Sequence, residues 1–416
     1  MNQREYQSLI LGALLHDIGK FLNRAKGVKK KHPLFSADFV SSESFRKIVK
    51  ENWVDLDLVK TLVQRHHEHS IMGDELIVQN IKDERTRALA YIVSRADSYS
   101  SQERIDEEPA DLDFRTARLM SIFSEIDIGK RSEFNKEDYA RYYNLKPLSP
   151  EGVFPQEKKD LSWDTYDYER HIDEFGKAMR NFKPKDFDSF ISGLISIMEK
   201  YLWCVPSDTK EEYNDIPLFD HLSTTSAIAA CLYQYHKENL LNEESIKDDN
   251  IDKFLLVAGD LSGIQKFIFE IGATNPKRLS KTLRGRSFYL SLLSDVISLK
   301  LLKALNLPLS CRIMHAGGRF VVLAPNTKVV KEFLKKFRDS LEDWLFKTFL
   351  GKLTLNICFD ITLSGKDFAS ERFAYKNKKL GESLELAKKQ RFYQKIKEGE
   401  DTLKPVSYTH LTLPTN

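Results

Sequence analysis

A histidine and an aspartate stand side by side next to an apolar segment near the N-terminus, and this pair constrains the fold most. Residues 9–15 read Leu-Ile-Leu-Gly-Ala-Leu-Leu and directly precede His16 and Asp17. On a helix of 3.6 residues per turn, Asp17 shares a row with Leu9 and Ala13, where a core residue is expected. Burying a carboxylate is costly unless a cation or a hydrogen-bond donor meets it. With an imidazole beside it, a metal ion is the simplest partner for this carboxylate.

Two further segments supply candidate ligands for such an ion. A histidine pair occurs downstream in Gln-Arg-His-His-Glu-His, and Asp97 shares a helical row with Leu89 and Val93. Histidine and carboxylate ligands without thiols suit a divalent transition metal (Mn, Ni, Co or Fe, or else Zn), as one ion or two, and Mg is possible if most ligands are oxygens or water. Two such ions activate water and hold a phosphodiester, so the set favours a metal-dependent phosphohydrolase. The predicted metal ligands are His16, Asp17, His66, His67 and Asp97.

Several neighbouring polar residues leave alternatives open. Taken alone, a His-Asp pair is usually a surface hydrogen bond, and a His-His pair is often a solvated turn. Lys20 lies one helical turn beyond the first pair and could face a phosphate, so we predict His16, Asp17 and Lys20 as catalytic residues. His32 lies in a basic stretch and is either a further ligand or part of a solvated turn. We expect the adjoining Glu-His after the histidine pair to be solvated.

Composition places the chain among ordinary globular proteins. With 416 residues, of which 41% are hydrophobic and 30% charged, it has room for about two to four domains. The longest apolar run is far too short for a membrane span, and no signal peptide precedes it, so we expect a cytoplasmic protein without membrane contact. The four cysteines contain no Cys-x-x-Cys, which favours a reducing compartment. A net charge of +3 leaves nucleic-acid binding to local patches.

Changes in periodicity along the chain predict an α+β multidomain protein. Residues 1–108 are helical and hold the whole predicted metal site, and residues 109–250 are a connector followed by a helical segment. Residues 251–365 alternate strands and helices in the order β-α-β-β-α-β, the ferredoxin-like or palm arrangement. A charged helical stretch follows over residues 366–405. Residues 406–416 have the character of translated vector sequence and are left out of the fold.

A second Asp-His pair, Asp220 and His221, superficially repeats the first. Asp220 precedes the apolar sequence Ala-Ile-Ala-Ala-Cys-Leu by a few residues, and aspartate is a good N-cap for a helix. No further ligands accompany the pair nearby in the sequence. We therefore expect a helix cap here and no metal site.

The predicted palm carries a candidate nucleotide site. Asp260 directly follows its first strand, where polymerases and nucleotide cyclases place a metal-binding acid. Leu261, Ser262 and Gly263 come next and could present backbone N–H groups and a hydroxyl to a phosphate at a helix N-terminus. An ordinary helix cap is an equally good reading of Asp260. The hairpin at residues 316–320 reads Ala-Gly-Gly-Arg-Phe and lacks the paired acids of a cyclase, so we expect nucleotide binding without turnover.

Four segments together resemble the large subunit of type III-A CRISPR effector complexes. They are residues 16–20 (His-Asp-Ile-Gly-Lys), 220–225 (Asp-His-Leu-Ser-Thr-Thr), 259–269 (Gly-Asp-Leu-Ser-Gly-Ile-Gln-Lys-Phe-Ile-Phe) and 317–320 (Gly-Gly-Arg-Phe). The resemblance implies an all-α HD domain that cuts single-stranded DNA and a pair of palm domains. The palm pair makes cyclic oligoadenylate from ATP, with Mg, when a target RNA is bound. It also implies a place in a multisubunit complex that contains guide RNA.

Carried over residue by residue, the five predicted metal ligands match the HD metal site. Asp260, Ser262 and Gly263 match the nucleotide-facing edge of the first palm. The family's second palm carries Gly-Gly-Asp-Asp, a tetrapeptide that this chain lacks. The resemblance therefore implies the N-terminal part of a protein about twice this length. Two alternatives stay open: a non-catalytic, nucleotide-binding scaffold of a guide-RNA complex, and a stand-alone HD phosphohydrolase acting on a small nucleotide.

Overall fold

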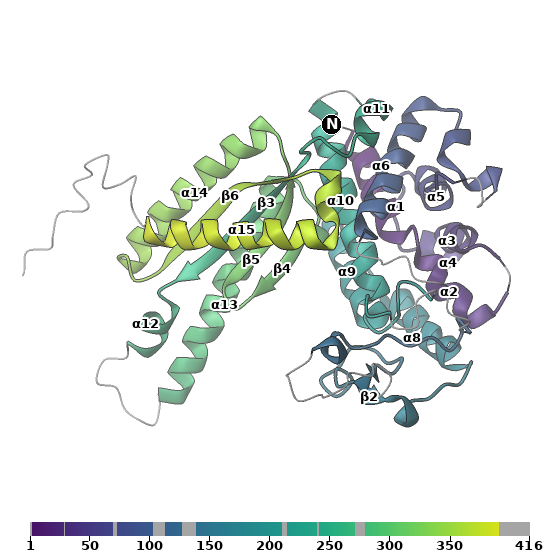
Figure 1. Ribbon diagram of the computed structural model, residues 1–416, viewed down its shortest axis with the longest axis horizontal. Coiled ribbons are helices and arrows are strands. Elements are labelled where there is room, and N and C mark those ends of the chain that lie inside the picture. Colours follow the sequence, from purple (N-terminus) through teal and green to yellow (C-terminus); the bar gives the residue numbers. More distant parts are fainter. Residues whose placement is uncertain are drawn as a thin grey trace, which may run out of the picture.

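The chain folds into a helical body and a sheet domain that lie side by side in a computed structural model (Figure 1). The residues that the structure describes are 2–28, 30–69, 73–102, 113–126, 139–209, 214–238, 241–270 and 279–390. The predicted vector-derived tail at 406–416 and the end of the charged stretch at 391–405 lie outside these ranges. Within the described residues, no helix combines the length and the apolar character that a membrane crossing requires.

The N-terminal helices pack around α1, which is buried along most of its length. Asn2 caps α1 by accepting a hydrogen bond from the Glu5 backbone N–H, and Asp55 and Asp83 cap α5 and α6 in the same way. Because α1 is apolar on nearly every side, it can lie only in an interior, with α5, α6 and α10 around it. The helices are α1 (Gln3–Leu15), α2 (Ile18–Lys26), α3 (His32–Ser41), α4 (Glu43–Arg46), α5 (Leu56–Gln64) and α6 (Glu84–Ser100).

The prediction that Asp17 continues the first helix is wrong. α1 ends at Leu15 and α2 begins at Ile18, with Asp17 between them at the N-cap position of α2. The side chain of Asp17 makes no capping hydrogen bond and is free to turn into the interior. The chain therefore breaks its helix at the His-Asp pair.

Helix α10 lies between the helical body and the sheet domain (Figure 1). It packs on α1 and α6 from one side and on strand β5 from the other. It begins at Leu218, so that Asp220 lies inside its first turn, and the predicted helix cap at Asp220 is wrong. The elements of this central segment are β1 (Arg141–Tyr142), β2 (Gln156–Glu157), α8 (Asp167–Asn181), α9 (Phe187–Leu202), α10 (Leu218–Glu238) and α11 (Glu243–Lys247).

The sheet domain contains four antiparallel strands in the order β4-β5-β3-β6. Gly317 and Gly318 form the hairpin between β4 and β5 with φ angles of 60° and 92°, a left-handed conformation that glycine adopts without strain. Helices α13 and α14 pack against the sheet, and α15 lies along β6 and β3. The elements are β3 (Phe254–Ser262), α12 (Ile264–Phe269), α13 (Leu279–Ala304), β4 (Arg312–Ala316), β5 (Arg319–Pro325), α14 (Lys328–Phe349), β6 (Thr354–Leu363) and α15 (Ser370–Lys389).

Strand β3 is longer than the sequence predicted, and this changes the place of Asp260. The strand runs to Ser262, so that Asp260 lies inside it and pairs with Arg319 of β5 and Asn356 of β6. Gly263, with a φ of 91°, holds the N-cap position of α12. The predicted position of Asp260 after the strand is wrong, and so is the helix-cap alternative.

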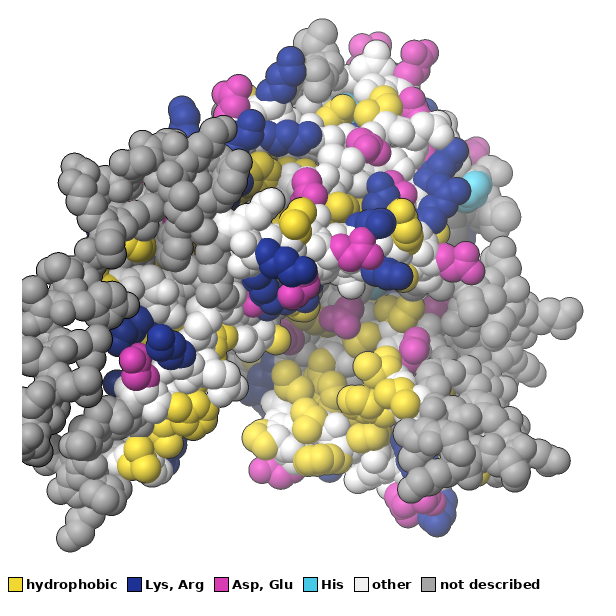
Figure 2. All heavy atoms as spheres, turned by 60° about the vertical axis from the view of Figure 1, so that its left-hand side comes forward, with side chains coloured by type: hydrophobic (Ala, Val, Ile, Leu, Met, Phe, Trp, Pro, Cys, Tyr) yellow, Lys and Arg dark blue, Asp and Glu magenta, His cyan; other side chains and the backbone are white. Residues whose placement is uncertain are grey.

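The outer surface mixes charge of both signs. On the face in Figure 2, basic and acidic side chains are interspersed over the upper half, and apolar side chains gather over the lower half. This mixture agrees with the net charge of +3. A binding surface for nucleic acid is therefore sought in a cavity and not on this face.

Candidate metal centre

Asp17 lies at the centre of a cluster of imidazoles and is almost completely buried. Its Oδ1 atom is 3.0 Å from His32 Nε2 and 3.6 Å from His66 Nε2. Its Oδ2 atom is 3.6 Å from both His16 Nε2 and His221 Nε2. One carboxylate thus faces two pairs of histidines, one with each oxygen.

The surrounding ligand atoms form two groups, and within each group all atoms lie within 4.8 Å of one another. The groups are His16, Asp17, Asp97 and His221, and His32, His66 and His67. Asp97 closes the first group, because its Oδ1 is 3.5 Å from His16 Nε2 and 3.2 Å from His221 Nε2. In the second group His67 Nε2 lies 3.2 Å from His32 Nε2. Asp17 lies between the groups, the position of a bridging carboxylate.

All five predicted metal ligands come together in this cluster, and two more histidines join them. The structure brings His32 into the second group, in line with the ligand alternative. It also brings in His221, and the expectation that the second Asp-His pair has no ligand role is therefore wrong for His221. The physical reason is that α10 packs directly on α1 and α6, a contact between segments that are far apart in the sequence. The signals in the sequence were the repeated Asp-His pair and the place of His221 in the segment 220–225 that resembles the family.

Hydrogen bonds fix the tautomers of two imidazoles. His16 Nδ1 lies 2.8 Å from the Ala13 carbonyl oxygen, and His66 Nδ1 lies 3.0 Å from that of Val63. A carbonyl can only accept, so each Nδ1 carries the proton and each Nε2 keeps a lone pair. The Nε2 atoms of His16, His66 and His221 are buried and have no hydrogen-bond partner of good geometry among the described residues. Buried imidazole nitrogens that have no hydrogen-bond partner in the described part of the chain and converge on carboxylates fit a metal site.

The electrostatics of the site favour ionised acids. Burial by itself would raise the pKa of Asp17, but the charges of Lys20, His32 and His16 outweigh it and hold that pKa well below the ordinary value. Burial likewise opposes ionisation of Asp97, and its interactions with His16 and His221 bring the pKa well below normal. Both carboxylates are therefore charged over the whole physiological pH range, the form that can bind a metal.

The imidazoles divide into two kinds. Burial lowers the pKa of His67 to about 3, with the neighbouring His66 as the next cause, and burial also lowers the pKa of His32. Burial acts on His221 too, but interactions with Asp17 and Asp97 outweigh it and raise its pKa. His32 and His67 therefore favour the neutral form, whereas His221 holds a proton more tightly than a free histidine.

Gly19 allows the close approach that positions His32. A Cβ atom at Gly19 would lie 2.0 Å from the His32 carbonyl oxygen and 2.8 Å from the Ser36 backbone nitrogen. The Gly19 N–H donates to Ser36 Oγ at 2.9 Å, and that hydroxyl donates to the His16 carbonyl at 2.7 Å. The glycine of the His-Asp-Ile-Gly-Lys segment thus lets α3 pack against α2 and holds His32 over Asp17.

Glu68 supports the histidine pair from behind, and the prediction that it is solvated is wrong. Its Oε1 accepts hydrogen bonds from Ser94 Oγ at 2.8 Å and from Arg95 Nε at 2.9 Å, both on α6. Because α6 also carries Asp97, these bonds tie the segment with His66 and His67 to the helix of a third ligand. His69 is exposed, as expected.

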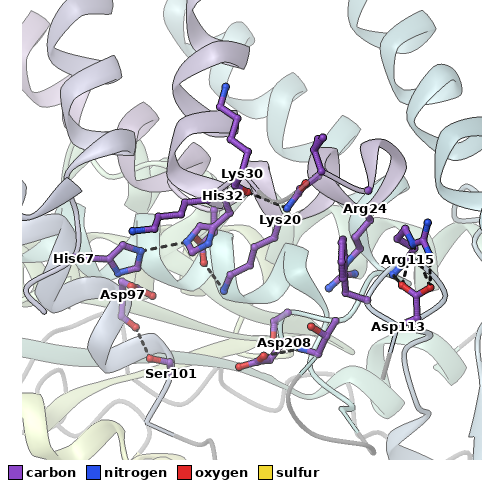
Figure 3. Close-up of a pocket in the computed structure, with 18 residues that line it drawn as sticks. Lys20, Arg24, Lys30, His32, His67, Asp97, Ser101, Asp113, Arg115 and Asp208 are labelled. Atoms are coloured by element: carbon purple, nitrogen blue, oxygen red, sulfur yellow. Dashed lines mark hydrogen bonds and ion pairs between the residues drawn. The ribbon is translucent and has the colours of Figure 1, made fainter. Parts of the chain in front are cut away.

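A cavity of about 830 Å³ opens over the cluster. Figure 3 looks into it, with His67 and Asp97 on one side, Asp113 and Arg115 on the other, and Lys20 between. Lys20 Nζ lies 2.6 Å from Asp17 Oδ2, so it now neutralises the bridging carboxylate. Further basic side chains line the cavity: Arg24, Lys30, Lys31 and Arg115. An anionic substrate that enters meets cations on its way to the ligand cluster.

The predicted nucleotide residues of the sheet domain are already engaged. Asp260 forms an ion pair with Lys388 of α15 at 2.9 Å. The Leu261 N–H donates to the Gly318 carbonyl, and Ser262 Oγ accepts from the Asn356 side chain at 2.9 Å. Gly263 is required where it stands, because a Cβ there would lie 2.0 Å from a backbone oxygen. A nucleotide at this edge would have to take Asp260 from Lys388.

Comparison with known proteins matches the N-terminal and C-terminal parts of the chain to two different family models. Residues 3–102 match the HD domain family, and residues 253–405 match the family described as Csm1 subunit domain B. The chain is 32% identical to the single-strand-specific deoxyribonuclease Cas10/Csm1 (subtype III-A) of Methanocaldococcus jannaschii over 95% of its length. It is 30% identical to the protein of the same description from Thermococcus onnurineus over 92%. The chain is therefore homologous to Cas10/Csm1 proteins of subtype III-A over most of its length.

Solved structures of Cas10/Csm1 proteins share the fold. Csm1 of T. onnurineus matches with a TM-score of 0.71 and 26% identity, covering 93% of this chain and 50% of that one. A Csm1–Csm4 cassette in complex with cA4 matches with a TM-score of 0.70 and 26% identity over 93% of this chain and 49% of that chain. The chain spans about half the length of the curated relatives, 51% and 47% of the two above. The HD match ends at residue 102, so His221 reaches the cluster from beyond it.

Proposed function

We propose that the helical body is a metal-dependent nuclease that hydrolyses single-stranded DNA. The observation that carries this proposal is the position of Asp17, with one oxygen toward His32 and His66 and the other toward His16 and His221. The curated relatives carry the description of single-strand-specific deoxyribonucleases, which supports the choice of substrate. We assign the metal ligands as His16, Asp17, His66, His67 and Asp97, with His32 and His221 added.

Individual residues of the cluster and the cavity would have different roles in such a reaction. A pair of divalent transition-metal ions (Mn, Ni, Co or Fe) would supply activated water and charge neutralisation at the phosphodiester. Asp17 would bridge the two binding positions, and Lys20, which now neutralises Asp17, would become available to a phosphate oxygen. The Ala13 and Val63 carbonyls keep His16 and His66 oriented with Nε2 toward the ions. The basic lining of the cavity would hold the flanking phosphates.

The test uses the purified chain and labelled oligonucleotides. After removal of metal by EDTA, addition of Mn²⁺, Co²⁺ or Ni²⁺ should restore cleavage of a single-stranded oligonucleotide and leave its duplex intact. Lack of cleavage with every one of these metals would contradict the proposal. Preference for a mononucleotide or a cyclic dinucleotide would instead favour the stand-alone phosphohydrolase alternative.

We also propose that the sheet domain is a ferredoxin-like palm that binds ATP. Its element order is β-α-β-β-α-β with two helices, α12 and α13, after the first strand, and this order and the antiparallel strand order support the reading. Related Csm1–Csm4 structures are described as complexes with one ATP, with AMPPNP and with cA4. We infer that Asp260, Leu261, Ser262 and Gly263 form the nucleotide-facing edge, with Mg and a second palm needed for synthesis of cyclic oligoadenylate.

The names of related structures also suggest the complex in which the chain works. We propose that the chain works in the cytoplasm as part of a guide-RNA complex that includes a Csm4-type subunit and is activated by target RNA. The description of related structures as Csm1–Csm4 subcomplexes of the type III-A interference complex supports this. The domain boundaries at about residues 108, 250 and 365 remain part of the proposal.

A further inference from the structure

A second, smaller recess adjoins the metal cavity on the side away from His67 and Asp97. The recess has a volume of about 190 Å³, and Asp113, Asp208 and Thr209 line both hollows. In Figure 3, Asp208 and Asp113 lie across the cavity from His67. A single bound strand can therefore place one group in the recess and another in the cavity.

The wall of the recess is aromatic and rigidly held. Trp163 keeps 37% of its surface exposed. Its Nε1 donates to the Lys158 carbonyl at 2.8 Å, and the Tyr142 ring meets it edge-on with centroids 6.1 Å apart. The Arg118 guanidinium lies 5.6 Å from the centroid of the same indole and is itself buried. An indole fixed in this way is a ready stacking surface for another flat ring.

The charges at the recess favour a neutral group over a phosphate. Two charged side chains of the recess are already paired: Asp113 with Arg115 at 2.8 Å, and Arg118 with Asp167 at 2.6 Å. These pairs leave little attraction for a phosphate. A neutral flat ring fits these surroundings, because it can stack on Trp163 without a charge partner.

We propose that this recess binds one nucleobase of the single-stranded substrate, stacked on Trp163, while the neighbouring phosphates follow the basic lining of the metal cavity. The volume fits a single ring system, since a cavity of roughly 150 Å³ accommodates a benzene ring. Bases of single-stranded DNA are unpaired and free to enter, whereas those of a duplex are held in its stack. The recess therefore makes the site selective for single strands. This inference rests on the proposed nuclease function.

The test measures binding without catalysis. A labelled oligonucleotide and a matched one with abasic residues at every position carry the same phosphates, and each is titrated with the full chain in EDTA. The chain should bind the base-containing strand more tightly. Trp163→Ala should weaken that binding about 5- to 150-fold, the range for stacking of one base, and leave the abasic strand unaffected. Trp163→Phe should retain most of the affinity.

Trp344→Ala is the control, because Trp344 is a similarly exposed tryptophan on α14 in the sheet domain. It should bind both strands as the unaltered chain does. The proposal is overturned if Trp163→Ala binds normally, or if it loses affinity equally for both strands. Should Trp163→Ala fail to fold, 2-aminopurine placed at successive positions of the strand decides the matter with the unaltered chain. Stacking on Trp163 must quench the fluorescence of 2-aminopurine at one position of the strand. If the fluorescence is quenched at no position, the base subsite is refuted.

These measurements distinguish failure of the base subsite from failure of the proposed nuclease function. Binding in EDTA does not depend on the nuclease reaction. Strand binding that depends on Trp163, together with no cleavage under any metal, would contradict the proposed nuclease and keep the base subsite. Metal-dependent cleavage that does not change with Trp163→Ala or with abasic substitution would support the proposed nuclease and contradict the base subsite.

Discussion

Replacement of His221 should remove one metal-binding position and leave the other. His221 contacts the Asp17 Oδ2 side of the cluster, where its Nε2 lies 3.2 Å from Asp97 Oδ1, and it does not belong to the group of His32, His66 and His67. His221→Ala should therefore reduce the binding stoichiometry from two ions to one. Asp17→Asn keeps the shape of the side chain but removes its negative charge from both metal-binding positions. It should therefore weaken the binding of both ions.

The expected magnitudes depend on whether the replaced side chain binds the ion directly. Removal of a residue that only orients a ligand costs 10- to 100-fold in metal affinity, so removal of a ligand itself should cost at least about 100-fold. A factor of 100 corresponds to about 2.7 kcal/mol. Cleavage of single-stranded DNA should fall by at least about 10² in Asp17→Asn, because the charge between the two ions is gone and Lys20 is left without its partner at 2.6 Å.

The assay is calorimetric titration of the metal-free chain with Mn²⁺ or Co²⁺, followed by cleavage of a labelled strand. His236→Ala is the matched control, because His236 lies on the same helix, is equally buried, and belongs to neither ligand group. It should bind two ions as the unaltered chain does. Two ions bound by His221→Ala with unchanged affinity would refute the ligand role of His221, and a single ion bound by the unaltered chain would refute the bridging role of Asp17.

Further outcomes test other parts of the structure. Gly19→Ala should destabilise the fold by about 1–3 kcal/mol in urea denaturation, because its Cβ would meet the His32 carbonyl at 2.0 Å, whereas Gly381→Ala, with open space around it, should not. Metal binding near pH 6.5 should release a proton from His221, whose pKa is raised by Asp17 and Asp97 against the effect of burial. The number of protons released should fall as pH rises above that pKa. Calorimetric titration in two buffers of different ionisation enthalpy measures this number, and a release that grows with pH would contradict the raised pKa of His221. Mg-ATP should bind the chain with a dissociation constant near 1 mM, about −4 kcal/mol, and more weakly after Asp260→Ala; micromolar binding indifferent to that change would locate the nucleotide elsewhere. Incubation of the chain with ATP, Mg²⁺ and target RNA should yield no cyclic oligoadenylate, since the chain lacks Gly-Gly-Asp-Asp, and any product on chromatography would show that the synthetic site is misassigned.

Local patterns were enough to find most elements and five of the seven residues that gather in the metal-ligand cluster. The apolar rows that include Ala13 and Val93 predicted buried helices, and the acids next to them predicted a metal, since an unpaired buried carboxylate is too costly to keep. The strands and the glycine hairpin of the sheet domain were predicted from short apolar runs and turn residues for the same reason: the signal lies within a few neighbouring residues.

The contacts between distant segments required the tertiary structure. His221 reaches the cluster only because α10 packs on α1 and α6, and His32 because Gly19 lets α3 approach α2. The recess beside the metal cavity likewise combines Asp113 with Trp163 and Asn214, which no local pattern connects. Hydrophobic periodicity states that a residue is buried, but it does not state which other buried residue it meets. That choice depends on how whole helices pack, and so the sequence determined the kind of chemistry while the packing determined which side chains perform it.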